Sequence, residues 1–322
     1  MSRRPDVTLA QMRYFERAAA HGSMTKAAAE LRIAQSAVSA AVAQLERRVG
    51  SQVFIRQRAR GLVLTAAGEE LLSDVRSALA HVDEVLDAAQ GRGEEVRGRL
   101  RLACFVTLAP FVLPDLLADV AEHHPAVTLE VVETQAETLG VALRSGAAEL
   151  GLSYDLGLGE EFERQVIGEI RPHVLLPADH RLADREQVAL QELRDEPLVL
   201  LDLPHSRDYF AQVLASAGLS PVARHRSQSF ETVRGMVAHG MGYSVLHLRP
   251  RDDMTYSGAR VRPVAISDDV EPLAIVLARL RSVRPTARER AVAARARSVL
   301  RRSAIGVARV RATEPSERRH LG

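Results

Sequence analysis

A heptad repeat at residues 72–89 limits what this chain of 322 residues can fold into, because it requires one long helix between two separate parts. Apolar side chains recur there at spacings of three and four residues, which is typical of the seam of a two-helix contact. The helix is expected to run from 65 to about 90, roughly 40 Å in length. Gly91 and Gly93 then make a hinge. The seam consists of Leu72, Val75, Leu79, Val82, Leu86 and Ala89.

This seam could pack against the chain's own body or against the same helix of a second copy. Charged side chains flank it, among them Asp74, Asp83 and Asp87, and they favour a partly exposed helix that pairs with a second copy. We therefore expect a linker and dimerisation helix at 65–92, with the seam positions 72 to 86 in a homodimer contact.

The charges of the chain are unevenly distributed. Residues 1–62 hold eleven Lys or Arg against four Asp or Glu, a net charge of +7, and residues 284–322 carry +8, so that 63–283 carries −13. A basic head on an acidic body suggests a polyanion as the partner of the head. The arginines near the C-terminus are interpreted as the solvated face of a surface helix that leads into a basic, disordered tail at 303–322.

Composition excludes several classes of protein. No run of about 18 apolar residues is present, so no membrane span is expected, and residues 1–6 do not resemble a secretion signal. Cys104 is the only cysteine, which rules out an intramolecular disulfide, a cysteine-cluster metal site and a sensor built on two cysteines of one chain. A cytoplasmic location fits this cysteine usage.

The first 50 residues predict three short helices. Thr8 caps the first helix and Gly22 ends it, and Ser23 caps the second. A turn at 32–34 leads into the third helix, expected at 35–49. Its inward face is predicted to hold Val38, Ala41, Val42, Leu45 and Val49, and its outward face Ser36, Ala40, Ala43 and Arg47, with Ser39 and Gln44 at the flanks.

Small side chains on the outward face would let the third helix approach the major groove of DNA closely, whereas the alternative is an ordinary three-helix bundle with an alanine-rich surface. The residues after the third helix favour DNA binding: 53–55 and 62–64 are predicted as strands, with a basic turn at 56–61. Three helices and a basic hairpin make a winged helix-turn-helix, with Arg56, Arg58 and Arg60 placed to meet phosphates.

Residues 9–68 closely resemble the DNA-binding domain of LysR-type regulators. The match includes Gly22-Ser23-Met24-Thr25-Lys26-Ala27-Ala28, Gln35-Ser36-Ala37-Val38-Ser39 and Leu64-Thr65-Ala66-Ala67-Gly68. Ala34, Ser36 and Ala40 depart from the Ser, Pro and Arg that family members often have there, so base contacts cannot be copied from relatives. The DNA contacts expected in this chain are Ser23, Thr25, Gln35, Ser36, Ser39, Ala40, Ala43, Gln44, Arg47, Arg56, Arg58 and Arg60.

Residues 98–302 alternate short apolar strands with amphipathic helices, which predicts an α/β architecture with a parallel sheet. The layout resembles the family's effector domain, which is similar to periplasmic (type 2) solute-binding proteins and has two lobes joined by two crossing strands. Lobe one is expected at 98–160 plus 262–302 and lobe two at 161–261, after a winged head at 1–64. Strands are expected at 100–105, 128–133, 150–154, 166–176, 198–201, 222–227, 244–248, 261–265 and 272–280, and helices near 108–123, 137–144, 207–217 and 230–239.

In such a sheet, ligands bind beyond the carboxyl ends of the strands. Thr107 and Ser206 each follow a predicted strand, one in each lobe, and by resemblance they are effector contacts. The alternative is that they are ordinary helix caps. His205 and Arg207 beside Ser206 suit a small anionic effector. The full expected set of effector contacts is Thr107, His205, Ser206, Arg207, Ser229 and Tyr243.

Catalysis has no support in the sequence. His123 and His124 lack a third ligand at metal spacing, Gly240-Met241-Gly242 follows a helix and lacks the third glycine of a nucleotide loop, and no nucleophile has a visible partner. No cofactor or metal is expected. The rival class, a solute-binding or enzymatic α/β protein with an incidental helical head, would need an export signal or a convergent set of titratable groups.

We therefore expect a transcriptional regulator that acts on the nucleoid in the cytoplasm and is controlled by a small molecule held between its lobes. By resemblance, a dimer or a dimer of dimers would read a pseudo-palindromic promoter site, and RNA polymerase stays open as a further partner. Activation and repression are both compatible with the sequence.

Overall fold

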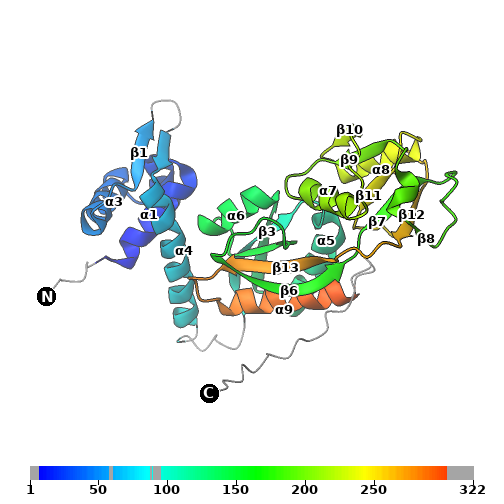
Figure 1. Ribbon diagram of the computed structural model, residues 1–322. Helices are drawn as coiled ribbons and strands as arrows, with labels where there is room; N and C mark the ends of the chain where they lie inside the picture. Colours follow the sequence, from blue (N-terminus) through cyan, green and yellow to red (C-terminus); the bar gives the residue numbers. More distant parts are fainter. Residues whose placement is uncertain (1–6, 58–60, 88, 90–95, 303–322) are drawn as a thin grey trace, which may run out of the picture.

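The computed structural model describes residues 7–57, 61–87, 89 and 96–302, and it has three parts in chain order (Figure 1). A helical head is joined by one long helix, α4, to a body of two lobes, in which helices pack on β-sheets. The expected winged head, linker helix and two-lobed α/β body are confirmed. The expected glycine hinge at 91 and 93 and the basic tail at 303–322 lie outside the described residues.

The head is formed by three helices and a hairpin whose ends match the sequence signals. Thr8 and Gln11 form both halves of a capping box at the start of the first helix. Ser23 accepts a hydrogen bond from the backbone N–H of Lys26 and caps the second helix. The third helix has the predicted bounds and ends at Gly50, which adopts a left-handed conformation. The elements are α1 (Leu9–His21), α2 (Met24–Leu31), α3 (Gln35–Val49), β1 (Phe54–Gln57) and β2 (Gly61–Leu64).

The core of the head is centred on Phe15, which is fully buried and contacts the Phe54 ring at a centroid distance of 5.3 Å. Val38, Val42 and Leu45 complete it from α3, as the inward face predicts. Val49 was expected inward too, but its side chain is 42% exposed, since α3 ends at this residue.

The linker helix α4 (Ala66–Asp87) divides the heptad seam between two environments. Leu72 and Val75 are buried in the core of the chain's own head, where α1 packs along α4. Further along the helix, Val85 is 67% and Leu86 48% exposed. The expectation that the whole seam faces a second copy is therefore corrected: Leu72 and Val75 are used inside the chain, Leu79 packs against the same core, and the exposed apolar side chains lie at the C-terminal end of the helix.

Lobe one contains a five-stranded mixed sheet in the order β4-β3-β5-β13-β6. The first three of these strands are parallel, but β13 runs antiparallel to both of its neighbours. The sheet is thus mixed, whereas the alternation of strands and helices predicted a parallel one, because β13 brings the chain back from lobe two. The elements are β3 (Gly98–Phe105), α5 (Ala109–His123), β4 (Val127–Thr134), α6 (Ala136–Arg144), β5 (Leu150–Tyr154), β6 (Phe162–Ile170), β13 (Leu273–Leu280) and α9 (Ala287–Arg302).

Lobe two contains a four-stranded sheet, β11-β7-β12-β8, and the parallel pair of β9 and β10. A bridge from Leu198 to Tyr243 places β9 beside β11. Neither β8 nor the short helix η2 was predicted. The elements are β7 (His173–Pro177), β8 (Gln187–Val188), η2 (Leu190–Leu193), β9 (Leu198–Leu201), α7 (Ser206–Ser216), β10 (Ala223–Ser227), α8 (Phe230–Ala238), β11 (Ser244–Leu246) and β12 (Val261–Ile266).

The strand predicted at 166–176 is wrong, because this segment forms two strands in two different sheets. β6 belongs to lobe one and β7 to lobe two, and Pro172 between them has no N–H to continue a strand ladder. The chain crosses back between β12 and β13. Lobe one therefore comprises 98–170 plus 273–302 and lobe two 173–266, so the predicted bounds, which ended the first part of lobe one at 160, placed both crossings too early.

The arginine-rich helix α9 is more than the solvated surface helix that the sequence suggested. Its apolar side packs on α5 and buries Val292, Val299 and Leu300. Arg295 makes a two-point hydrogen bond with the carboxylate of Asp119 on α5, with an Nη2–Oδ1 distance of 2.9 Å. This guanidinium holds the pKa of Asp119 well below its usual range. Part of the basic charge of α9 is thus used to join α9 to α5.

Candidate DNA-binding surface and effector cleft

The outward face of α3 is open to solvent, with its opposite face held in the head core. Gln44 is engaged at its amide, where Oε1 accepts a hydrogen bond of 2.8 Å from Gln11 Nε2. The remaining side chains of the face make no such contact with the rest of the described head, so they are available to a ligand. Gln35, Ser36, Ala40, Gln44 and Arg47 are exposed, and Ser39 and Ala43 are half-buried.

The other predicted DNA contacts flank this helix. Thr25 is exposed on α2, whereas the side chain of Ser23 is occupied as a cap. The wing is anchored beside them, because the Leu62 N–H donates to the carbonyl oxygen of Gly22 at 2.9 Å. Arg56 lies on β1. The side chain of Arg56 and residues 58 and 60 are outside the described part of the chain, so their roles stay predictions.

The carboxyl ends of strands from both lobes meet where the two lobes pack against each other, and we call this interlobe contact the cleft. On the side of lobe one, Thr107 follows β3 and is buried, with its hydroxyl 3.2 Å from the Tyr154 hydroxyl at the end of β5. Burial raises the pKa of Tyr154 well above its usual range. These two hydroxyls therefore face the cleft as neutral groups.

Lobe two contributes the start of α7, where Ser206 is 2% exposed. His205 before it has a φ of 61°, a left-handed conformation that is uncommon for residues other than glycine. Its ring lies directly on Gly157 of lobe one, where a Cβ atom would come within 2.6 Å of Nε2. The two lobes touch at this point, and Gly157 provides the space for it.

His247 is a cleft residue that the sequence analysis missed. It follows β11, is 5% exposed, and stacks on the Tyr154 ring of lobe one at a centroid distance of 5.0 Å. The strand was predicted to extend to 248, which placed His247 inside the strand and not at its carboxyl end. With the true end at 246, the rule that selected Thr107 and Ser206 would have selected His247 as well.

Tyr243 was predicted as an effector contact, and the structure corrects this. It pairs with Leu198, the first residue of β9, and so lies at the end of these parallel strands that is remote from the cleft. Ser229 is exposed and accepts a hydrogen bond from the Thr232 N–H as the cap of α8. This contact fits the alternative that Ser229 is an ordinary helix cap. Arg207 is ion-paired with Asp202 at 3.0 Å.

We expect the buried His247 to make folding stability sensitive to acid. Burial lowers its pKa to about 3, from an unperturbed 6.5. As the pH falls below about 6.5 the unfolded chain takes up the proton first, so the folded state should lose about 2 kcal/mol from this residue between pH 7 and pH 5. The measurement is urea unfolding of the parent and of His247→Phe at both pH values, and the stability difference between them should move by that amount in favour of the variant at pH 5.

Glu289 makes the folded state more stable as the pH falls, the reverse of the effect of His247, because burial and the charge of Glu149 raise its pKa to about 7. It is present in both proteins, so its contribution cancels in the comparison. If the difference in unfolding free energy between the parent and His247→Phe is the same at pH 7 and pH 5, His247 is not held in its neutral form.

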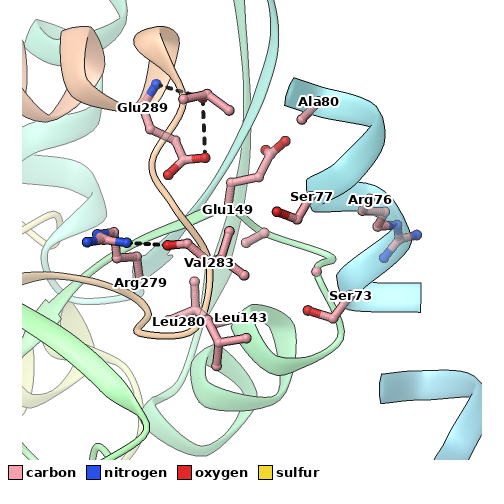
Figure 2. Close-up of a pocket in the computed structure, with 13 residues that line it drawn as sticks. Ser73, Arg76, Ser77, Ala80, Leu143, Glu149, Arg279, Leu280, Val283 and Glu289 are labelled. Carbon is pink, nitrogen blue, oxygen red and sulfur yellow. Dashed lines mark hydrogen bonds between the residues drawn. The ribbon is translucent and has the colours of Figure 1, made fainter. Parts of the chain in front are cut away.

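A small cavity lies between α4 and lobe one, beside the place where they touch (Figure 2). It has a volume of about 30 Å³, enough for one or two waters, and Ser73 and Ser77 face it from α4. Next to it, Arg76 donates to the Ser145 carbonyl of lobe one at 2.9 Å and lies 3.5 Å from the Glu16 carboxylate of the head. Arg76 thus contacts the head and the body from the helix between them.

The geometry defines a class of protein: a winged DNA-binding head carried by a linker helix on a two-lobed ligand-binding body. Two family models match, the bacterial regulatory helix-turn-helix protein of the lysR family over residues 9–69 and the LysR substrate binding domain over residues 93–301. The chain belongs to the LysR family of transcriptional regulators, which is not an enzyme family. No described helix is long and apolar enough to cross a membrane.

Similar proteins agree with this assignment. The chain is 33% identical over 244 residues to the "Probable hydrogen peroxide-inducible genes activator" of Mycobacterium avium, covering 74% of this chain and 77% of that protein. HinK, a LysR family transcriptional regulator from Pseudomonas aeruginosa, is 33% identical and superposes with a TM-score of 0.61 over 91% of this chain and 98% of HinK. A full-length OxyR variant from Pseudomonas aeruginosa shares the fold, with a TM-score of 0.76 at 23% identity over 93% of this chain and 99% of that chain.

Proposed function

We propose that this regulator reads a promoter through α3 in the major groove and through its wing on the flanking phosphates. The observation that carries the proposal is the division of α3 into a face buried in the head core and an exposed face of small and polar side chains. A face without long charged side chains allows close approach to base edges, and the wing arginines would add contacts that are independent of sequence. The target is nucleoid DNA in the cytoplasm.

We predict different effects for one residue of α3 and one of the wing, measured on a site selected from random DNA. Arg58→Ala should weaken binding to all sequences alike and lower the slope of log affinity against log salt by about one, because one phosphate contact is lost. Ser39→Ala should leave the salt slope unchanged and alter the preferred sequence. Loss of binding by Arg58→Ala to the selected site only, with an unchanged slope, would contradict the phosphate role of the wing.

The proposed target is a pseudo-palindromic site bound by two copies of the chain. The support is the exposed apolar surface on the C-terminal half of α4, at Val85 and Leu86. Two heads on one dimer would occupy two half-sites at a fixed spacing. A dimer of dimers, and contact with RNA polymerase, extend this proposal on the strength of the family alone.

The effector is proposed to bind in the cleft between the lobes and to shift the equilibrium between two arrangements of the heads. Thr107 and Ser206 support this as buried hydroxyls at strand ends of opposite lobes. Only a ligand that binds one arrangement better than the other can change DNA binding. The Arg76 contacts with Ser145 and Glu16 offer a route from the body to the head.

Peroxide sensing through a pair of thiols is not part of the proposal, although a similar protein carries the name of a peroxide-inducible activator. This chain has one cysteine, Cys104, whose side chain is fully buried in β3. Burial raises the pKa of the Cys104 thiol well above its usual range. Since the thiolate is the reactive form, the structure offers neither a second thiol nor a reactive first one.

A further inference from the structure

The two lobes are in contact through a stack of rings in the cleft. His247 of lobe two lies between Tyr154 of lobe one, at 5.0 Å and 28° between ring planes, and Tyr209 of lobe two, at 5.3 Å and 26°. Nearby, Phe111 of lobe one meets Phe230 of lobe two edge to face at 5.8 Å. A planar ligand that separated Tyr154 from His247 would meet one ring face from each lobe.

The polar groups at this stack are neutral. His247 Nε2 is buried and has no hydrogen-bond partner among the described residues. Because burial keeps the pKa of His247 low, its ring carries no charge at neutral pH. The hydroxyls of Thr107 and Tyr154 bond to each other. A buried polar atom without a hydrogen-bond partner is unfavourable, so a ligand that bonds Nε2 would supply the hydrogen bond that this atom lacks.

The cations near the cleft are already engaged. Arg207 is paired with Asp202 at 3.0 Å and lies 3.6 Å from Asp208. Arg171, near the crossing between the lobes, donates to the Val270 carbonyl at 3.3 Å. The charges of Arg171 and Glu271 both act on Tyr209, in opposite directions. A buried carboxylate is strongly unfavourable without a charge partner, and to pair with Arg207 it would have to displace Asp202.

From these contacts we infer that the effector is a planar molecule without net charge, which inserts between the Tyr154 and His247 rings and bonds His247 Nε2. This inference rests on the proposed role of the cleft as the effector site, and it replaces the anionic effector expected from the sequence. The charge on Arg207, which suggested an anion, is neutralised by the carboxylate of Asp202.

The test uses matched pairs of planar probes that differ in charge: benzamide with benzoate, and nicotinamide with nicotinate. Binding to the full chain is measured by saturation-transfer NMR titration at millimolar probe. We expect each amide to bind at least about tenfold more tightly than its acid, and His247→Leu to weaken amide binding about tenfold through loss of a stacking face. His247→Phe keeps a ring but loses Nε2, so it should weaken amide binding less than His247→Leu does and still measurably, and Arg207→Gln should change nothing.

Three results would overturn the inference. They are an acid that binds as tightly as its amide, loss of probe binding in Arg207→Gln, and no binding of either amide. The variant Thr107→Val shows whether only the class of effector is wrong or whether the cleft is not the effector site at all. If Thr107→Val weakens acid binding, the cleft is still the effector site and only the class of effector is wrong. If probes bind but no cleft variant changes their affinity, the effector site itself lies elsewhere.

Discussion

Gly68→Ala is expected to destabilise the winged head by about 3 kcal/mol, although the same change in an isolated helix is usually stabilising. Gly68 lies in the first turn of α4, where its N–H donates to the Thr65 hydroxyl at 2.9 Å. A Cβ atom there would come within 2.1 Å of the Val53 carbonyl oxygen and 2.9 Å of its carbonyl carbon. That oxygen already accepts the Thr65 N–H at 3.1 Å. Both obstacles are backbone atoms, so α4 has to move away from β1.

The measurement is thermal or urea unfolding of the full chain, with the head transition compared between parent and variant. Gly235→Ala is the matched control, because Gly235 lies inside α8 and a Cβ atom there meets nothing within 4 Å. The control should be neutral or more stable by up to about 1 kcal/mol, from the higher helix propensity of alanine. If both variants are equally stable, the close approach of α4 to β1 does not exist in solution.

Val85→Glu combined with Leu86→Glu should convert a dimer into a monomer and lower operator affinity by at least about 100-fold, because two half-sites are then occupied independently. These side chains are the most exposed apolar pair of the described part of α4, at 67% and 48%. Two like charges facing two more across a dimer contact would repel each other, and the apolar area that holds the copies together would be lost.

Sedimentation velocity and gel shifts on a two-half-site duplex measure the two effects. The conservative double variant Val85→Ile with Leu86→Met should remain a dimer with the affinity of the parent, and affinity for an isolated half-site should be unchanged by the glutamates. A glutamate variant that sediments as the parent would show that α4 is not the contact. The equivalent change at Leu72 would be uninformative, because that side chain belongs to the core of the head.

Local sequence signals predicted the head almost completely. Thr8, Ser23 and Gly50 end or cap helices through hydrogen bonds to residues three or four positions away, and the periodic apolar side chains of 35–49 were sufficient to define α3 and its buried face. Thr107 and Ser206 were found for a similar reason, since each lies between a strand that was recognisable from its own residues and the following helix or its start.

Contacts between residues distant in sequence decided the rest. The segment 166–176 is rich in apolar residues at both ends, and only the sheets of two lobes divide it into β6 and β7. Only packing against α1 takes Leu72 and Val75 away from a partner copy, and only the stack on Tyr154 identifies His247 as a cleft residue. Sequence periodicity shows which side of an element is apolar. Which surface covers that side depends on where the whole chain places the other elements, and the residues of one element do not contain that information.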